Sequence, residues 1–182
     1  IQSIVRKNIT LLKDKKYEHE ATLNLISLGE DAVPALIETV KNPSEKASQR
    51  LAVIDILGDI KDENATDCLL KHVKDSNVKI RRASAKALGR IGDRKAVEGL
   101  KEVLADFDAE TRYLAVRSLQ QIKDPSLGGT FMKLADDADV RIRVLAISGL
   151  GDIKETGSVE KLSRFTEDYN DDVRLNLAIA LG

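Results

Sequence analysis

The residues that decide the fold are VKIRRASAKALGRIGD, at positions 78–93. Apolar and small side chains recur in this stretch every three or four positions, which is the spacing of one face of an α-helix. The preceding Lys74-Asp75-Ser76-Asn77 is rich in residues that form turns and cap helix N-termini. Gly92-Asp93 interrupts the pattern at the other end. We therefore predict a helix that buries Ile80, Ala83, Ser84, Ala87, Leu88 and Ile91.

The helix pattern returns along the chain with a period of 31 residues. One leucine position is occupied in five successive units, by Leu57, Leu88, Leu119, Leu150 and Leu181. The next position, the glycine slot, holds Gly58, Gly89, Gln120, Gly151 and Gly182. An arginine stands eight residues before each glycine slot, at Arg50, Arg81, Arg112, Arg143 and Arg174. A fixed period of this length indicates stacked structural repeats.

Each unit is predicted to contain two helices. In residues 62–92 the first helix precedes the turn, and its apolar face is formed by Ala65, Leu69, Leu70 and Val73. One such hairpin cannot bury its apolar face alone, so it stacks on its neighbours. We therefore predict an all-α solenoid, a single repeat domain at 1–182, with units at about 1–30, 31–61, 62–92, 93–123, 124–154 and 155–182. Gly128-Gly129, inside the expected first helix of the fifth unit, predicts a kink or a late helix start.

Composition and charge argue against several classes of protein. The chain has 29 basic and 30 acidic residues and a net charge of -1, which gives no electrostatic footprint for nucleic-acid binding. Aromatic residues make up 3% and Trp is missing, which disfavours a β-sandwich. The apolar runs are far shorter than a membrane span. We therefore expect neither nucleic acid nor a membrane as a partner.

The single cysteine, Cys68, excludes an intrachain disulfide and favours a reducing compartment, so we expect a cytoplasmic protein. The sequence starts at Ile1 and stops at Gly182 in the middle of the repeat pattern. We expect it to be a fragment, and targeting signals can lie outside it. The apolar end of the last helix then predicts a further repeat in the parent chain or self-association of the fragment.

Two strings resemble a known family, the phycobilisome-lyase HEAT-like repeats. They are residues 78–93 and Asp31-Ala32-Val33-Pro34-Ala35-Leu36, and the resemblance covers roughly 31–182 well and 1–30 weakly. It implies a right-handed superhelix whose second helices line the concave face. The family includes bilin lyases, although most members are scaffolds or uncharacterised. The resemblance is therefore specific for the fold and weak for function.

The resemblance also implies a role for the repeated arginines. In HEAT proteins a turn aspartate and a second-helix arginine six residues later belong to a hydrogen-bond ladder between repeats. The pairs with this spacing are Asp75/Arg81, Asp106/Arg112, Asp137/Arg143 and Asp168/Arg174. Arg50 has Ser44 at the corresponding position. Because a catalytic arginine would be unique and this one recurs, we interpret the series as structural.

No set of residues has the pattern of a catalytic or metal site. His19-Glu20 is similar to a string in deoxyhypusine hydroxylase, which holds two irons with several His-Glu pairs, but this chain has one pair. Its other histidine, His72, stands one helical turn from Cys68, and two residues on one outer helix make no pocket. Phosphate-loop and zinc spacings are also missing. We expect no catalytic residue, no cofactor and no metal.

One face of the second helices is a candidate binding surface. Arg82, Lys86 and Arg90 form a basic stripe at helical spacing, beside Tyr113 and Arg117 of the next unit. Residues 62–92 contain seven basic and four acidic residues, whereas residues 155–182 contain three and six, so the near-neutral total conceals local charge. Such a stripe favours an acidic segment of another protein, with Tyr113 as an aromatic anchor. The alternative is a solvated helix face without a partner.

Three functions remain open from the sequence. The first is a non-catalytic scaffold for protein–protein interaction on the concave face, because solenoids offer long concave surfaces. The second is a bilin lyase-like enzyme subunit or a chaperone of chromophore attachment, which rests on family analogy. The third is a HEAT-like nucleic-acid-binding module, against which the charge balance and the lack of Trp both count.

Overall fold

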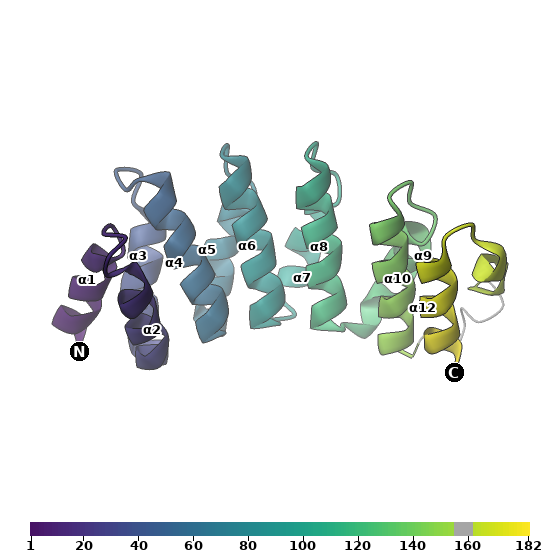
Figure 1. The fold of residues 1–182 in the computed structure, drawn as a ribbon, viewed down its shortest axis with the longest axis horizontal. Coiled ribbons are helices and arrows are strands. Elements are labelled where there is room, and N and C mark those ends of the chain that lie inside the picture. The colour runs from purple at the N-terminus through teal and green to yellow at the C-terminus, as the bar shows by residue number, and fades with distance from the viewer. Residues whose placement is uncertain (155–161) are drawn as a thin grey trace.

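The computed structural model describes residues 1–154 and 162–182, and these residues form a row of helical hairpins (Figure 1). The eleven α-helices of the described residues are α1 (Gln2–Leu11), α2 (Glu18–Leu28), α3 (Val33–Lys41), α4 (Ala47–Ile60), α5 (Thr66–His72), α6 (Val78–Ile91), α7 (Ala96–Val103), α8 (Ala109–Ile122), α9 (Gly128–Leu134), α10 (Val140–Asp152) and α12 (Asp171–Leu181). Short 3-10 turns occupy Gly29–Asp31, Glu63–Ala65, Pro125–Leu127 and Ser163–Glu167. The predicted all-α solenoid is confirmed. The start of the sixth unit, 155–161, lies outside the described residues.

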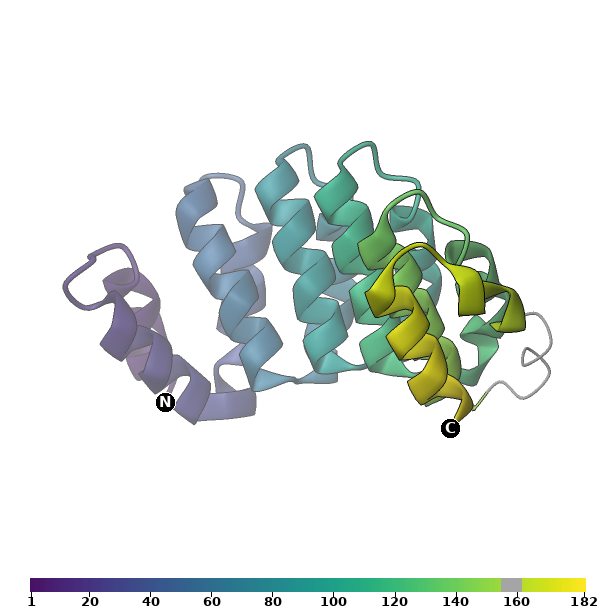
Figure 2. The same cartoon turned by 45° about the vertical axis from the view of Figure 1, so that its right-hand side comes forward.

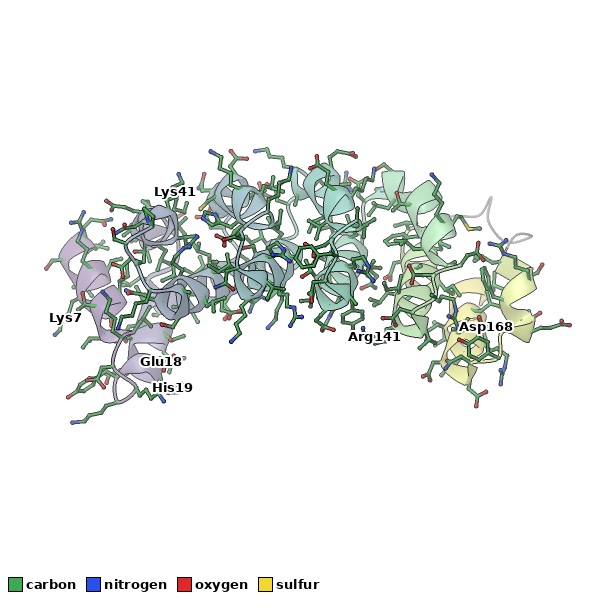
Figure 3. All side chains as sticks on the ribbon, turned by 90° about the horizontal axis from the view of Figure 1, so that it is seen from above. Lys7, Glu18, His19, Lys41, Arg141 and Asp168 are labelled. Atoms are coloured by element: carbon green, nitrogen blue, oxygen red, sulfur yellow. The ribbon has the colours of Figure 1, made fainter. Side chains whose placement is uncertain are left out.

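The helices lie in two curved layers. Seen from above in Figure 3, the first helices of the hairpins lie on the outer side of an arc and the second helices on its inner side. Lys41, at the end of α3, labels the outer side, and Arg141, in α10, labels the inner side. Figure 2 shows the turns between first and second helices along one edge of the array. None of the helices in the described ranges is long and apolar enough to cross a membrane.

The turn sequences cap the second helices as their Asx residues predict. The side chains of Asn77, Asp108, Asp139 and Asn170 each accept a hydrogen bond from a backbone N–H in the first turn of the following helix. Gly128-Gly129 marks a late helix start, because α9 begins at Gly128 after the 3-10 turn Pro125–Leu127. Turn chemistry therefore sets where the helices begin.

Glycine at the glycine slot allows consecutive second helices to approach closely. A Cβ atom added at Gly89 would lie 2.5 Å from the Ser118 hydroxyl of α8, and one at Gly151 would lie 2.8 Å from the Cβ of Ala180 in α12. Gln120 departs from this pattern, and its amide donates to Asp152 at 2.5 Å. Gln120 lies in α8, and this helix packs less closely on α10 than on α6.

The repeated arginines connect each unit to the next, and we call this series the arginine ladder. Arg81 donates to both carboxylate oxygens of Asp106, at 2.8 and 3.2 Å, and to the backbone carbonyl of Asp75, at 3.0 Å. Arg143 repeats this arrangement with Asp168 and the carbonyl of Asp137. Arg81 and Arg143 thus each bind the carboxylate of the following unit and only the backbone carbonyl of the aspartate six residues before them.

Each turn aspartate also accepts a backbone N–H within its own turn, and this second contact explains the pairing. The carboxylate of Asp75 accepts the backbone N–H of Asn77 and the guanidinium of Arg50 from the preceding unit. Its oxygens are therefore already bonded, and Arg81 of the same unit reaches forward to Asp106. Arg50 lacks a turn aspartate of its own and donates to the carbonyl of Val40.

The ladder lacks one ion pair. Arg112 donates to the carbonyls of Asp106 and Phe107, but among the described residues it makes no ion pair with Asp137. This break falls at the junction between α8 and α10 where Gln120 replaces glycine. Two independent departures thus coincide at one junction, where the second helices pack less closely than α4 with α6, α6 with α8, or α10 with α12.

We expect Arg81→Ala to destabilise the protein more than Arg112→Ala. The side chains of Arg81 and Asp106 are 6% and 10% exposed, so removal of Arg81 leaves a buried carboxylate without its counter-charge, at a cost of about 3–5 kcal/mol. Arg112→Ala removes hydrogen bonds to two carbonyls only, at a cost of roughly 1–2 kcal/mol. Urea unfolding followed by circular dichroism measures both. Equal losses would show that the ion pair to the next unit is not the main contribution.

Candidate functional site

The inner side of the second helices carries a row of side chains that packing does not require. The row stands three residues before each glycine slot and is here called the concave row: Asp55, Lys86, Arg117, Ser148 and Ile179. The residues at one and two positions on either side of it are mostly buried against other helices. Lys86, Arg117 and Ile179 are exposed, and Asp55 and Ser148 are half-buried. The concave row therefore faces away from the first helices.

Arg82, which the sequence placed in the basic stripe, is held by a carboxylate. Its guanidinium donates to both oxygens of Asp108, at 2.8 and 2.7 Å. This hydrogen bond, together with those from Thr111, holds the pKa of Asp108 well below its usual range. The same contact raises the pKa of Arg82. Because Asp108 also caps α8, Arg82 is part of the packing between the third and fourth units.

Arg90 is also paired. Its guanidinium binds Asp59 at 2.5 Å and Asp55 at 2.8 Å, both on α4. A Cβ atom added at Gly58 would lie 2.9 Å from this guanidinium, so the glycine slot of the second unit makes room for it. Arg90 therefore largely neutralises the two aspartates that α4 presents on the inner face.

Lys86 and Arg117 are the cations of the predicted site that stay available. The Lys86 side chain is 52% exposed, and its nearest carboxylate, Asp55, lies 4.0 Å away and is shared with Arg90. Arg117 is exposed and has no ion pair among the described residues. The two occupy equivalent positions on α6 and α8, which pack side by side. Of the five predicted residues, Lys86 and Arg117 are therefore the two cations that no close ion pair holds among the described residues.

Tyr113 is covered on one face by an arginine that the sequence analysis did not select. The Arg141 guanidinium lies 4.5 Å from the centre of its ring and binds Asp139 at 2.8 Å and Glu110 at 3.0 Å. The sequence contained a signal for the ion pair of Arg141 with Glu110, because these opposite charges occupy the same repeat position one period apart. Tyr113 stays half-buried, with one ring face occupied by the neighbouring unit.

The C-terminal part of the inner face is apolar. Leu175 and Ile179, one helical turn apart on α12, are 59% and 69% exposed. Val144 stands at the position of Leu175 on the preceding second helix and is half-buried. Leu181 is 42% exposed, although its equivalents in the inner repeats are buried. The inner face therefore changes from paired charges at α4, through free cations at α6 and α8, to apolar side chains at α12.

Two exposed aromatic residues belong to the arginine ladder. Phe107 and Tyr169, 86% and 80% exposed, each follow a turn aspartate of the ladder. The Arg81 guanidinium lies 4.6 Å from the Phe107 ring, and Arg143 lies 5.0 Å from the Tyr169 ring. A hollow of 430 Å³ beside Phe107 is lined by the ion pair of Arg81 with Asp106. Stacking on the ladder accounts for both rings without a ligand.

His19 lies apart from the other candidate reactive residues, whereas His72 and Cys68 are in contact on α5. His19 is exposed on α2. The Nδ1 atom of His72 lies 2.8 Å from the carbonyl oxygen of Cys68 and 3.8 Å from its Sγ atom. Cys68 is buried, and burial raises the pKa of its thiol. Among the described residues, no group of three or more His, Cys, Asp or Glu side chains is placed to hold a metal ion.

Sequence comparison assigns the family. The pattern of HEAT repeats matches residues 33–108 and 97–182, which together span most of the chain. The chain belongs to the HEAT-repeat family. No curated protein matches this HEAT array in sequence.

Solved structures with the same arrangement are distant in sequence. The complex of CpcE and CpcF of phycocyanin lyase from Nostoc sp. PCC7120 matches with a TM-score of 0.64 at 17% identity, over 98% of this chain and 74% of that one. The archaeal HEAT-like repeats protein from Thermococcus onnurineus NA1 matches with a TM-score of 0.67 at 15% identity, over 97% and 78%. A designed armadillo repeat protein in complex with the peptide (KR)4 matches with a TM-score of 0.66 at 16% identity, over 96% and 97%. These likenesses show the fold of the HEAT array.

We expect Cys68 to react slowly with a thiol reagent in the folded protein. Its side chain is buried and its raised pKa lowers the thiolate fraction at neutral pH. With Ellman's reagent at pH 7.5, the reaction should be at least about tenfold slower than in 8 M urea, since only unfolding exposes the thiol. Equal rates in the two solvents would mean that Cys68 is accessible and reactive.

We expect Arg82→Ala to lower the melting temperature in a pH-dependent manner and Lys86→Ala to leave it nearly unchanged. The pKa of Asp108 is lower in the folded than in the unfolded chain, so its pairing contributes stability above the ordinary carboxyl pKa of about 4 and loses it as pH falls further. The gap between wild type and Arg82→Ala should therefore be constant above about pH 5 and shrink below about pH 4. Thermal melts from pH 3 to 8 measure this gap, and a gap that is unchanged at pH 3 would exclude Asp108 as the cause.

Proposed function

We propose that this HEAT array is a non-catalytic scaffold that binds a segment of another protein on the inner face of its second helices. The observation that carries the proposal is the concave row. Its residues are exposed at Lys86, Arg117 and Ile179 and half-buried at Asp55 and Ser148, whereas most of their neighbours on the second helices are buried. Long concave surfaces of this kind are the usual binding surfaces of repeat proteins.

The distribution of charge partners supports the same surface. Arg50, Arg81, Arg82, Arg90 and Arg143 are all bound to carboxylates of neighbouring units. Lys86 and Arg117 lie in the middle of this network. Lys86 has one weak contact, with Asp55, and Arg117 has no ion pair among the described residues. Elsewhere the array pairs its arginines with its own carboxylates. A carboxylate of a bound partner would give Lys86 and Arg117 the counter-charge that they lack.

The two other functions have less support. The likeness to phycocyanin lyase concerns the fold, and no described residue of this chain is tied by it to bilin chemistry. Nucleic-acid binding would require a basic surface, and most of the arginines on the inner side are neutralised by aspartates within the array. We therefore propose protein binding and no catalysis.

Selection from a random-peptide display library tests the location of the site. Peptides enriched on the wild-type protein should bind it in solution and lose at least about tenfold in affinity for Arg117→Glu. Lys133→Glu is the matched control, because Lys133 is an exposed cation on the first helix α9 and has no ion pair among the described residues. Fluorescence anisotropy measures binding, and circular dichroism checks that both variants are folded.

Two outcomes would contradict the proposal. Peptides that bind Arg117→Glu as well as wild type, or that lose binding equally to Lys133→Glu, would place the site outside the concave row. Light scattering of the free protein over the same concentrations shows whether a second copy occupies the surface, as the exposed end of α12 allows. If the protein dimerises and Arg117→Glu makes it monomeric, the partner is the chain itself.

A further inference from the structure

We propose that the concave row selects an extended segment in which acidic side chains are followed, or preceded, by apolar ones. This inference rests on the proposed function and names the chemistry of the partner. It follows from the order of residues along the row, which is ion-paired at α4, cationic at α6 and α8, uncharged at Ser148 of α10, and apolar at α12. The sequence alone predicted a stripe along a single helix, whereas the contacts place the gradient across the helices.

The N-terminal end of the row is closed to a charged partner. Asp55 and Asp59 are both bonded to Arg90, which fills the space above Gly58. A cationic side chain arriving here would have to displace an arginine that bridges two carboxylates. This end therefore offers no free anion, although the aspartates are partly exposed.

The two cations in the middle of the row would be neutralised by anionic groups of a partner. Lys86 and Arg117 stand at the same repeat position on neighbouring helices, and neither has a strong ion pair among the described residues. Like charges on adjacent helices repel, and the array neutralises its other inner cations with its own aspartates. Two carboxylates of a bound segment, one for each cation, would remove this repulsion.

The C-terminal end of the row requires apolar groups. Ile179 is 69% exposed. A further repeat stacks on each of the four equivalent positions, of which Lys86 and Arg117 are exposed and Asp55 and Ser148 half-buried. Stacking between repeats therefore leaves this position at least partly exposed. An isoleucine here, beside Leu175 on the same helix, gives an apolar surface that a partner can cover.

Helix spacing sets the spacing of the partner's side chains. Packed helices lie roughly 8–10 Å apart, and an extended chain advances about 3.3 Å per residue, so one repeat corresponds to about three residues. The segment should then carry two acidic residues about three positions apart, for Lys86 and Arg117. An apolar residue should follow about six positions after the first acidic residue, for Val144, which lies one helical turn before Ser148 on α10. A second should follow about nine positions after it, for Leu175 and Ile179 on α12.

Labelled synthetic peptides of about twelve residues test this pattern. The ordered peptide has Glu at positions 2 and 5 and Leu at positions 8 and 11, and its reversed sequence covers the opposite chain direction. Three controls share its length: a scrambled order of the same composition, a version with Lys in place of Glu, and a version with Ser in place of Leu. Anisotropy is measured at low and high salt, because contacts with exposed charges weaken with ionic strength.

We expect the ordered peptide or its reverse to bind at least about tenfold more tightly than each control. The double variant Lys86→Glu/Arg117→Glu should lose this peptide and gain the Lys version, while Lys133→Glu should change neither. Ile179→Ser should weaken binding several-fold and leave its salt dependence unchanged, because it removes apolar contact only. Melting temperatures of the variants separate loss of binding from loss of folding.

The inference is overturned if the Glu and Lys peptides bind equally, if the charge reversal does not exchange them, or if none of the peptides binds. These results leave the proposed function open to its own test. Library peptides that depend on Arg117 but lack the acidic and apolar order would keep the site and remove this partner chemistry. Library peptides that do not depend on Arg117 would remove the site itself.

Discussion

The arginine ladder is the interaction on which the rest of the array depends. Arg81 bridges the backbone carbonyl of its own turn and the carboxylate of the next, so one side chain sets the distance and the angle between two repeats. Burial strengthens this contact. It also makes the loss of either partner strongly destabilising, because a buried carboxylate without its counter-charge lowers the free energy of unfolding. Each turn aspartate further holds the backbone N–H two residues ahead. The ladder thus couples the shape of each turn to the stacking of its neighbours.

The ladder also determines which side chains are left for a partner. Turn residues and buried arginines occupy one edge of the array, and small residues at the glycine slot bring the second helices close together. The concave row is then the part of the second helix whose side chains take least part in packing and in the ladder. On the inner face, whether a cation is available depends on the next unit, since Arg82 binds Asp108 whereas Arg117 has no ion pair among the described residues.

The junction between α8 and α10 departs from this scheme in a consistent way. Gln120 fills the glycine slot, Arg112 does not reach Asp137, and other contacts replace them. Arg141 stacks on Tyr113 and binds Glu110, and Asp152 accepts from both Gln120 and Lys123. This junction lies between Arg117 on α8 and Ile179 on α12, the cationic and apolar parts of the concave row. Any change in curvature at this junction would therefore alter the spacing between the cationic and apolar parts of the surface.

The sequence by itself determined the repeat, the helices and their caps. A period of 31 residues with apolar positions at helical spacing leaves few alternatives, and the Asx residues of the turns can cap only the helix that follows them. The arginine series could be recognised as structural because it recurs. These features are local or periodic, so the identity of a residue and its position in the unit are sufficient to predict them.

Only the tertiary structure decided which charges are free. In the sequence, Arg82, Lys86 and Arg90 form one equivalent stripe, yet their partners lie 26 and 31 to 35 residues away, on neighbouring helices. Whether a carboxylate lies within reach depends on helix separation and side-chain direction, which the glycine slot and the ladder set together. The exposure of Ile179 also became informative only beside Lys86 and Arg117 on the folded array. Electrostatic pairing falls off with distance in space, and distance along the chain does not reveal it.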